Sequence, residues 1–587
     1  MTDKMKPHYG SDLIVDLMKA LGIEYAALAP GATFRGIHDS MVNYGGNERP
    51  KVIFCCHEEY SVAIAQGYAK VTGKPMAALT HNIVGLQHAS MAIFNAWCDR
   101  VPVLVLGGTG PMDVTRRRPW IDWIHTALVQ GNQVRDYVKW DDQPHNLRSV
   151  PMSFLRGHRI ASTEPKGPVY LCFDADIQED EIKEPVEMPD LSQFLPPSPI
   201  QADPQALRQA ARLLHQAESP LIIADYFGRH PEAVPSLIEL AELFAIPVID
   251  KGNRFNFPNT NPLDVTGMEQ ELVKQADVIL ALDVQDLYGS LATVNRTTRV
   301  SEPSTSPSAK IIHISLNEML MRSWASDYHR LQPTHLPITA DTSLAVPELL
   351  RLCRETGRIE GEKKRQIEAR FKALQAGQER QRAKWRTEAR DAAGRKEIST
   401  AFLASEIWEV IKGEDWILVN GTSNRWARKL WDWTQPGQYL GDSGGAGLGY
   451  GLPGSIGAAL AHLNTGKLCI DIQSDGDFLM AASALWTAAH HKIPLLVVMF
   501  NNRSFYNSEE HGRKIAQFRG RPAENAKIGT HLDNPPVNFP KMAESYGVKA
   551  EGPIERPEEL RPALQRALRI VKDERRPALV DVVSDPR

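Results

Sequence analysis

The sequence predicts an α/β protein made of three doubly wound domains whose sheets are mostly parallel. Short apolar runs, such as PLIIAD at 220–225 and DVILALD at 277–283, alternate with longer segments of helical character. A chain of 587 residues has room for about three to four domains. Its hydrophobic fraction of 42% supplies enough apolar side chains for several cores.

The domain boundaries follow from changes in composition. We predict an N-terminal domain over residues 1–190, which ends in the strand-like run PVYLCFD and an acidic stretch. A proline-rich linker follows. We then predict a central, Rossmann-like domain over 195–358 and a C-terminal domain over 398–587. The charged segment 359–397 between them favours a solvated helical linker over a binding tail.

Bulk properties exclude several classes of protein. A net charge of −4 and an isoelectric point near 6.5 give no reason to expect nucleic acid or an anionic membrane as partner. No apolar run approaches the roughly 18 residues of a membrane span, and the first residues do not resemble a leader. The six cysteines show no CxxC spacing, which favours reduced thiols over disulfides or cysteine-bound zinc. We therefore expect a cytoplasmic metabolic enzyme.

Two apolar runs in the C-terminal domain end in oxygen-bearing side chains. LCIDI leads into the turn SDGD, which contains Asp475, and LLVVMF ends at Asn502. With a helix predicted at 479–491 between them, the two runs become adjacent parallel strands. Their oxygens and a nearby backbone carbonyl suit Mg²⁺, whose shell a diphosphate would complete. Either element alone would more often be a helix cap or a turn, but together they favour a metal site.

At this point the chain resembles the thiamine-diphosphate-dependent enzymes of the acetolactate synthase, benzoylformate decarboxylase and benzaldehyde lyase group. Their signature is Gly-Asp-Gly followed, roughly 25 to 30 residues later, by Asn-Asn, and here 27 residues separate Asp475 from Asn502. The resemblance implies that these two residues and the backbone oxygen of Ser504 bind the metal. It also puts Gly476 and Asp477 at the diphosphate, although the first glycine of the signature is a serine here. A carboxylate such as Asp477 beside a diphosphate must point away or meet a cation.

The segment CHEEYSVAIAQGYAKVTGKP at 56–75 supports the same resemblance. In the family this segment carries the glutamate that contacts the aminopyrimidine ring of the cofactor, and Glu58 falls on that position. A carboxyl group bonded to the ring nitrogen favours the imino tautomer, which can remove the thiazolium proton. In isolation Glu58 would be an ordinary first-turn helix residue. Its neighbour Glu59 is expected at the surface.

Two further segments are predicted to contact the cofactor. The glycine-rich stretch at 443–454 lets the backbone approach a ligand, although close helix packing would explain it equally well. By resemblance, the Ala446 carbonyl accepts from the pyrimidine amino group and Leu448 is the apolar wedge that holds the cofactor bent. Thr422 and Ser423, at a helix start after the strand WILVN, are predicted to bind the diphosphate.

The side that faces the substrate is expected to come from the N-terminal domain. Ala32 lies in the loop that meets cofactor and substrate in relatives, and makes that side small and non-basic. His81 falls where benzoylformate decarboxylase has an active-site histidine, and His125 where benzaldehyde lyase and acetolactate synthase carry glutamine. A histidine with a near-neutral pKa can relay protons, so we place both with Glu58 as candidate catalytic residues. A purely structural role for either histidine is equally open.

The resemblance also bears on flavin and on assembly. Some relatives carry flavin in the central domain, but Asp225 and Tyr226 replace the small residues that would admit a dinucleotide phosphate, which argues against FAD without excluding it. In the family, the active site lies between the N-terminal domain of one subunit and the C-terminal domain of another. A homodimer or homotetramer is therefore implied.

The sequence thus predicts an enzyme that uses thiamine diphosphate and Mg²⁺ to cleave or form C–C bonds next to a carbonyl. The leading version is decarboxylation of a 2-oxo acid with carboligation, as in acetolactate synthase. The first alternative is a lyase or hydrolase of 2-hydroxyketones or 1,2-diones that does not decarboxylate, which the two histidines and Ala32 would suit. A non-catalytic cofactor-binding protein is the alternative of another class, and Glu58 argues against it.

Overall fold

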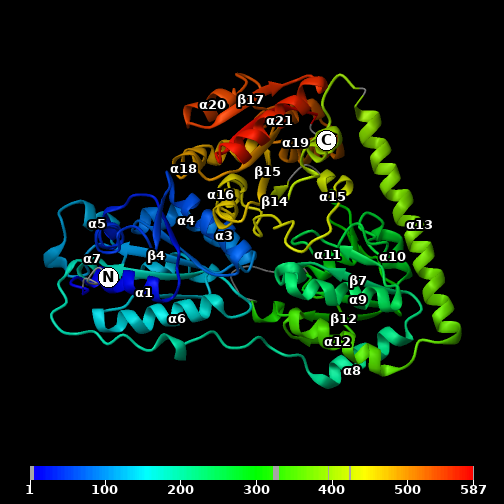
Figure 1. Cartoon of the computed structure of the whole chain (residues 1–587), viewed down its shortest axis with the longest axis horizontal. Coiled ribbons are helices and arrows are strands. Elements are labelled where there is room, and N and C mark those ends of the chain that lie inside the picture. The colour runs from blue at the N-terminus through cyan, green and yellow to red at the C-terminus, as the bar shows by residue number, and fades with distance from the viewer. Residues whose placement is uncertain (1–5, 321–329, 394, 422–424, 586–587) are drawn as a thin grey trace.

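The computed structural model describes residues 6–320, 330–393, 395–421 and 425–585, and it confirms the predicted α/β class. Three parallel sheets follow one another along the chain (Figure 1). Among the helices that this part of the chain contains, none combines the length and the apolar character that crossing a bilayer requires.

The N-terminal sheet has the strand order β2-β1-β3-β4-β6-β5. Its strands are buried on both faces: Leu104 and Leu106 pack into one core, and Val103 and Val105 into another. The strands are β1 (Tyr25–Leu28), β2 (Lys51–Phe54), β3 (Met76–Thr80), β4 (Val103–Thr109), β5 (Trp140–Asp142) and β6 (Val169–Asp174). The helices that cover them include α1 (Gly10–Ala20), α3 (Glu58–Thr72), α4 (Ile83–Cys98) and α6 (Val150–Ser162).

The central sheet has five strands in the order β13-β12-β9-β7-β8, and the predicted runs PLIIAD and DVILALD form β7 and β9. The edge strand β13 includes Pro337, which hides it from a search for apolar runs. A separate antiparallel pair, β10 (Ala292–Val294) and β11 (Ser301–Pro303), was also not predicted. The central strands are β7 (Pro220–Ala224), β8 (Val248–Asp250), β9 (Val278–Leu282), β12 (Lys310–Ser315) and β13 (Leu336–Thr339), with α8 (Pro204–Gln216), α9 (Val234–Phe244) and α12 (Thr342–Thr356).

The C-terminal sheet has the order β14-β15-β16-β18-β17. Strands β15 and β16 are parallel neighbours, as predicted. The single helix predicted at 479–491 is wrong: α17 (Asp475–Ala481) and α18 (Ala484–His490) replace it. Between them, Ser483 Oγ donates to the Tyr60 hydroxyl on α3, a contact that the local sequence does not reveal. The strands are β14 (Trp416–Gly421), β15 (Leu468–Ser474), β16 (Leu496–Asn501), β17 (Lys549–Ile554) and β18 (Ala578–Val583).

Glycines join the N-terminal and C-terminal sheets within one chain. Helices α3 and α16 (Gly451–Ala461) cross so closely that a Cβ on Gly67 would lie 1.9 Å from the Gly454 carbonyl oxygen. A Cβ on Gly457 would meet the Ile64 carbonyl at the same distance. Only residues without a side chain allow this backbone contact, so the crossing fixes how the two sheets meet.

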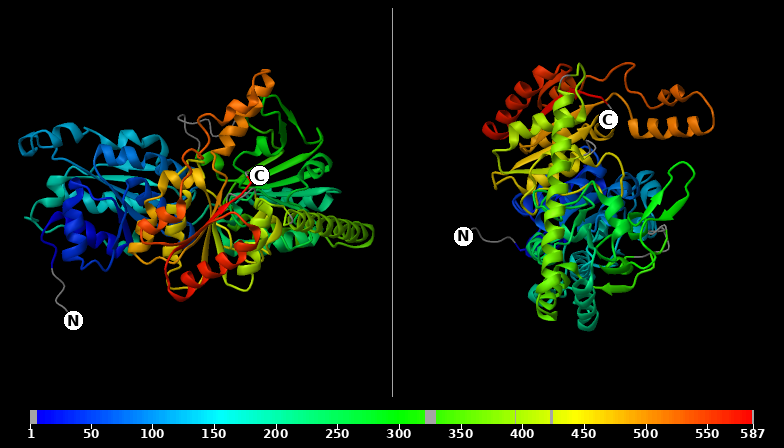
Figure 2. Two further views of the ribbon diagram at one scale, coloured as in Figure 1. Left: turned by 90° about the horizontal axis from the view of Figure 1, so that it is seen from above. Right: turned by 90° about the vertical axis from the view of Figure 1, so that its right-hand side faces the viewer.

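The charged segment after the central domain forms one long helix, α13 (Gly361–Ala392), which runs along one side of the molecule (Figures 1 and 2). Its basic side chains do more than contact water. Arg370 Nε donates to the Ala245 carbonyl of the central domain at 3.0 Å, and Arg382 pairs with Asp432 of the C-terminal domain. The helix therefore ties these two domains together.

Candidate active site

Three predicted site residues follow neighbouring strands of the N-terminal sheet. Ala32 comes after β1, Glu58 after β2 and His81 after β3, and these strands lie side by side in the order β2-β1-β3. Because the strands are parallel, their carboxyl ends share one edge of the sheet. Gly31, just before the exposed Ala32, leaves no room for a side chain, since a Cβ there would lie 2.9 Å from the His81 Cβ.

Glu58 is the first residue of α3, and its side chain is 12% exposed. Its Oε2 lies 3.0 Å from Nδ1 of His88 on α4. A Cβ on Gly85 would lie 2.7 Å from Glu58 Oε1, so the glycine makes room for the carboxylate against α4. The His57 and His88 rings stack with centroids 4.5 Å apart. His88 was not predicted as a site residue. The one feature of the sequence that could indicate it is its position one helical turn after Gly85.

His81 is hydrogen-bonded to Thr33. The Asn82 backbone N–H donates to Thr33 Oγ1 at 3.0 Å, and Thr33 Oγ1 lies 2.9 Å from His81 Nδ1. The Thr33 hydroxyl is the donor in this bond when the proton of the neutral imidazole is on Nε2. Burial, followed by repulsion from His125, lowers the pKa of His81. The lowered pKa favours a neutral imidazole at His81, and the tautomer with its proton on Nε2 can donate from that atom.

His125 lies beside His81. It ends the short helix α5 (Ile121–His125), and its ring centroid is 5.6 Å from that of His81 at 80°. Its Nδ1 is buried and has no hydrogen-bond partner within the described residues. Several apolar side chains near it in the sequence are exposed: Trp120 is 70% exposed, Trp123 73% and Leu128 79%. The two predicted histidines are thus brought together, and one of them has an unused ring nitrogen.

The predicted metal ligands converge at the edge of the C-terminal sheet. Asp475 begins α17 after β15, and Asn502 follows β16. The Ser504 backbone N–H donates to both Asp475 Oδ2, at 3.2 Å, and Asn502 Oδ1, at 3.0 Å, so these two oxygens lie close together. Arg503, with φ of 55°, makes the left-handed turn that directs this N–H back toward them.

The chemistry of this donor set fits Mg²⁺. Asp475 is 1% exposed, and burial raises its pKa to about 6. A bound divalent cation would stabilise its charged form. A carboxylate, an amide oxygen and a backbone carbonyl at one sheet edge are the oxygen ligands that Mg²⁺ prefers.

Asp477 turns toward the glycine-rich loop. Its Oδ1 accepts from the Gly449 N–H at 2.7 Å, and its Oδ2 accepts from the Gly451 N–H at 3.3 Å and from Gln473 Nε2 at 2.7 Å. The carboxylate therefore holds the loop, and a direct contact with the diphosphate stays a prediction. Gly476 packs against an aromatic ring, because a Cβ there would lie 2.6 Å from the side chain of Phe505.

The glycine-rich loop packs on α4 of the same chain. Asn95 bonds both backbone groups of Gly447, with the N–H donating at 3.1 Å and the carbonyl accepting at 3.3 Å. Close packing thus explains several of the glycines. Ala446, whose φ is 54°, and Leu448, which is 50% exposed, both lie at the surface of the loop. The remaining diphosphate candidates, Thr422 and Ser423, lie outside the described residues.

The expectation that Glu59 lies at the surface is wrong. Its side chain is 19% exposed, and a Cβ on Gly449 would lie 3.0 Å from its Oε1. Burial and the charge of Asp477 raise the pKa of Glu59 to about 7. Consecutive glutamates at the start of α3 therefore face different surroundings: Glu58 meets α4, and Glu59 meets the glycine-rich loop of the C-terminal domain.

Comparison with known families matches all three sheets. The models described as thiamine pyrophosphate enzyme N-terminal TPP binding domain, central domain and C-terminal TPP binding domain match residues 8–131, 207–349 and 420–582. The chain belongs to the thiamine pyrophosphate enzymes. It is therefore a thiamine-diphosphate-dependent enzyme of the carboligase and lyase type.

Relatives resemble this thiamine pyrophosphate enzyme over almost its whole length. It is 25% identical over 580 residues to the acetolactate synthase large subunit of Haemophilus influenzae, covering 96% of this chain and 93% of that one. It is also 25% identical over 600 residues to acetolactate synthase 2, chloroplastic, of Nicotiana tabacum, covering 98% and 82% of the two chains.

Solved structures share the fold. The benzoylformate decarboxylase of Polynucleobacter necessarius superimposes with a TM-score of 0.76 at 18% identity, and the 4-hydroxybenzoylformate decarboxylase of Rhodococcus jostii with 0.74 at 19%. Each comparison covers 98% of this chain and 99% of the other.

Proposed function

We propose that the two sheet edges are the two halves of a site for thiamine diphosphate and Mg²⁺. Asp475, Asn502 and the backbone oxygen of Ser504 would hold the metal, and Gly476 and the loop with Ala446 and Leu448 would hold the cofactor. The shared Ser504 hydrogen bonds and the buried charge of Asp475 support the metal assignment.

The catalytic proposal rests on the position and burial of the Glu58 carboxyl group. This group is mostly buried and is held in a hydrogen bond at the sheet edge. A carboxyl group that hydrogen-bonds the aminopyrimidine nitrogen of the cofactor needs such a fixed position. When bound, the cofactor supplies a carbon nucleophile that adds to a carbonyl and stabilises the charge left by a departing group. His81 would then donate from Nε2 to a developing substrate oxygen, and His125 would accept a proton at its unused Nδ1.

The reaction we propose is decarboxylation of a 2-oxo acid followed by carboligation, in the manner of acetolactate synthase. The relatives that carry this name match almost the whole chain, which supports the proposal. Ala32 leaves the substrate side small, which suits a short donor such as pyruvate.

A second candidate is a lyase or hydrolase of 2-hydroxyketones or 1,2-diones that releases no carbon dioxide. The observation in its favour is the pair His81 and His125, whose rings lie 5.6 Å apart. Such a pair can shuttle a proton between a hydroxyl and a carbonyl oxygen without loss of a carboxylate.

We further propose a homodimer or homotetramer with active sites between subunits. The exposed Trp120, Trp123 and Leu128 next to His125 support it, because apolar patches of this kind mark interfaces. Flavin binding is not proposed. Tyr226 follows β7 and is 1% exposed, and the guanidinium carbons of Arg100 and Arg254 each lie 5.3 Å from its ring centroid.

The test supplies enzyme, Mg²⁺ and thiamine diphosphate with pyruvate, and measures carbon dioxide and acetolactate. Release of both by the wild-type enzyme, with neither from Glu58→Gln, is the expected result. Turnover of a hydroxyketone or dione without carbon dioxide would favour the second candidate. Unchanged turnover by Glu58→Gln would contradict the role given to Glu58.

A further inference from the structure

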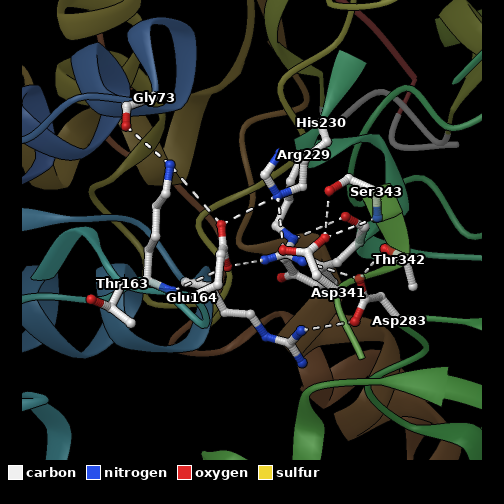
Figure 3. A network of polar contacts seen from close by, with 12 residues as sticks. Gly73, Thr163, Glu164, Arg229, His230, Asp283, Asp341, Thr342 and Ser343 are labelled. Carbon is white, nitrogen blue, oxygen red and sulfur yellow. Dashed lines mark hydrogen bonds and ion pairs between the residues drawn. The ribbon is translucent and has the colours of Figure 1, made fainter. Parts of the chain in front are cut away.

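A cluster of buried polar groups joins the N-terminal and central domains (Figure 3). Glu164 lies between α6 and β6 of the N-terminal domain, His230 follows β7, and Asp341 caps the start of α12. Their side chains are 8%, 17% and 0% exposed. One ligand atom of each, Glu164 Oε1, His230 Nε2 and Asp341 Oδ2, faces the other two, all within 4.8 Å of one another.

The remaining atoms of the two carboxylates are already bonded. Asp341 Oδ1 accepts from the Ser343 N–H at 2.9 Å and from its hydroxyl at 2.6 Å. Glu164 Oε2 accepts from Arg229 Nη1 at 3.0 Å. By contrast, Asp341 Oδ2 and His230 Nε2 are buried without a hydrogen-bond partner within the described chain. A fully buried carboxylate oxygen with no donor is costly unless a cation meets it.

Among the charged groups around the cluster, His230 is the ion-pair partner of Asp341. Arg229 donates to both Glu164 and Asp283 at 3.0 Å, and Asp283 also meets Arg100. These two guanidinium groups balance Glu164 and Asp283. Lys166 lies 4.0 Å from Glu164, but its amine donates to the Gly73 carbonyl and its side chain is partly exposed. With a neutral His230, one buried negative charge remains at Asp341. A protonated His230, whose Nδ1 also lies 3.3 Å from Glu232 Oε1, would compensate that charge.

We propose that Glu164, His230 and Asp341 bind a divalent transition metal such as Zn²⁺, which links the N-terminal domain to the central domain. Tetrahedral zinc with bonds of about 2.0 to 2.2 Å holds neighbouring ligand atoms about 3.4 Å apart. His230 Nε2 lies 3.3 Å from Glu164 Oε1 and 3.8 Å from Asp341 Oδ2. A proton shared with these carboxylates would instead draw them to about 2.7 to 2.9 Å. One nitrogen and two carboxylate oxygens are a donor set that zinc accepts, with water as the fourth ligand.

The test measures zinc binding and needs no activity. The enzyme is stripped with a chelator, dialysed, and returned to excess Mg²⁺ and thiamine diphosphate so that the proposed active site is filled. Titration with ZnCl₂ by calorimetry is expected to show one site per chain, weakened at least about 30-fold in His230→Gln and in Asp341→Asn. Asp203→Asn is the matched control, because Asp203 caps α8 in the same domain as Asp341 caps α12. It should bind zinc like the wild-type enzyme.

Asparagine at 341 keeps an oxygen that can cap α12, and circular dichroism checks that each variant is folded. His230→Gln carries the test alone if Asp341→Asn does not fold. Cobalt gives an independent signal: Co²⁺ in the wild-type site should show the intense visible absorption of tetrahedral coordination. No saturable site in the wild-type enzyme, or zinc affinity as high as that of the wild-type enzyme in both site variants, would overturn the proposal.

Discussion

Oε2 of Glu58 lies 3.0 Å from Nδ1 of His88, and this bond joins a mostly buried carboxylate to a histidine whose side chain is 56% exposed. His88 thereby fixes the direction of the Glu58 side chain.

We expect His88→Leu to slow proton exchange at the reactive carbon of the bound cofactor by about 10-fold, because Glu58 loses its orienting partner. Quenched-flow exchange in deuterium oxide, read by NMR, measures this step without a substrate. His88→Gln keeps a donor and should recover part of the rate. His8→Gln is the matched control, since His8 forms an exposed pair with Glu181. Equal exchange rates in His88→Leu and wild type would remove His88 from this role.

Thr33 should act by orienting His81. Thr33→Val removes the hydroxyl that is hydrogen-bonded to His81 Nδ1, so the ring loses the partner that holds its direction. We expect kcat to fall about 10-fold while cofactor exchange is unchanged, because Glu58 is untouched. Thr33→Ser keeps the hydroxyl and should restore kcat. A loss of cofactor exchange in Thr33→Val would point to a structural effect instead.

Asp475→Asn should weaken binding of Mg²⁺ and thiamine diphosphate on the order of 100-fold, because the only charged ligand of the proposed metal site is lost. Quenching of tryptophan fluorescence during cofactor titration measures the affinity. Asp415→Asn is the control: Asp415 lies in the same domain, is 63% exposed and pairs with Lys467. Wild-type affinity in Asp475→Asn would refute the metal assignment.

Glu59 should make the cofactor-free protein less stable as pH rises. Its pKa in the folded protein is raised to about 7 by burial and by Asp477, whereas an unfolded glutamate titrates near about 4.3. The folded state thus holds the extra proton, and the stabilisation present at low pH is lost as pH rises through about 7.

We therefore expect Glu59→Gln to raise Tm by a few degrees near pH 8, corresponding to about 1 to 2 kcal/mol, and to change it little near pH 5. Glu362→Gln, at a glutamate that is 66% exposed, is the control and should change Tm at neither pH. A Tm gain in Glu59→Gln of equal size at both pH values would contradict the titration of Glu59.

The fold and the sheet edges could be predicted because they depend on local patterns. Apolar runs marked β15 and β16, and parallel pairing then put Asp475 and Asn502 at one edge. His88 and Glu59 could not be assigned, because their contacts join segments that only tertiary packing brings together. The break between α17 and α18 was also missed; Ser483, which lies in it, bonds Tyr60 over 400 positions away.

The direction of the Asp477 side chain could not be predicted, for a different reason. Its place in the signature predicts the diphosphate as its neighbour, but nothing local indicates that the amides of Gly449 and Gly451 take its oxygens. A motif gives the position of a side chain along the chain, and its direction depends on the donors that the fold brings near.

The most direct test of the account mixes the enzyme, loaded with Mg²⁺ and thiamine diphosphate, with pyruvate, quenches the mixture in acid and identifies the cofactor species by proton NMR. The account predicts a lactyl or hydroxyethyl adduct in the wild-type enzyme and unmodified cofactor in Glu58→Gln. Unmodified cofactor in the wild-type enzyme would contradict 2-oxo acid chemistry on a pyruvate-sized donor.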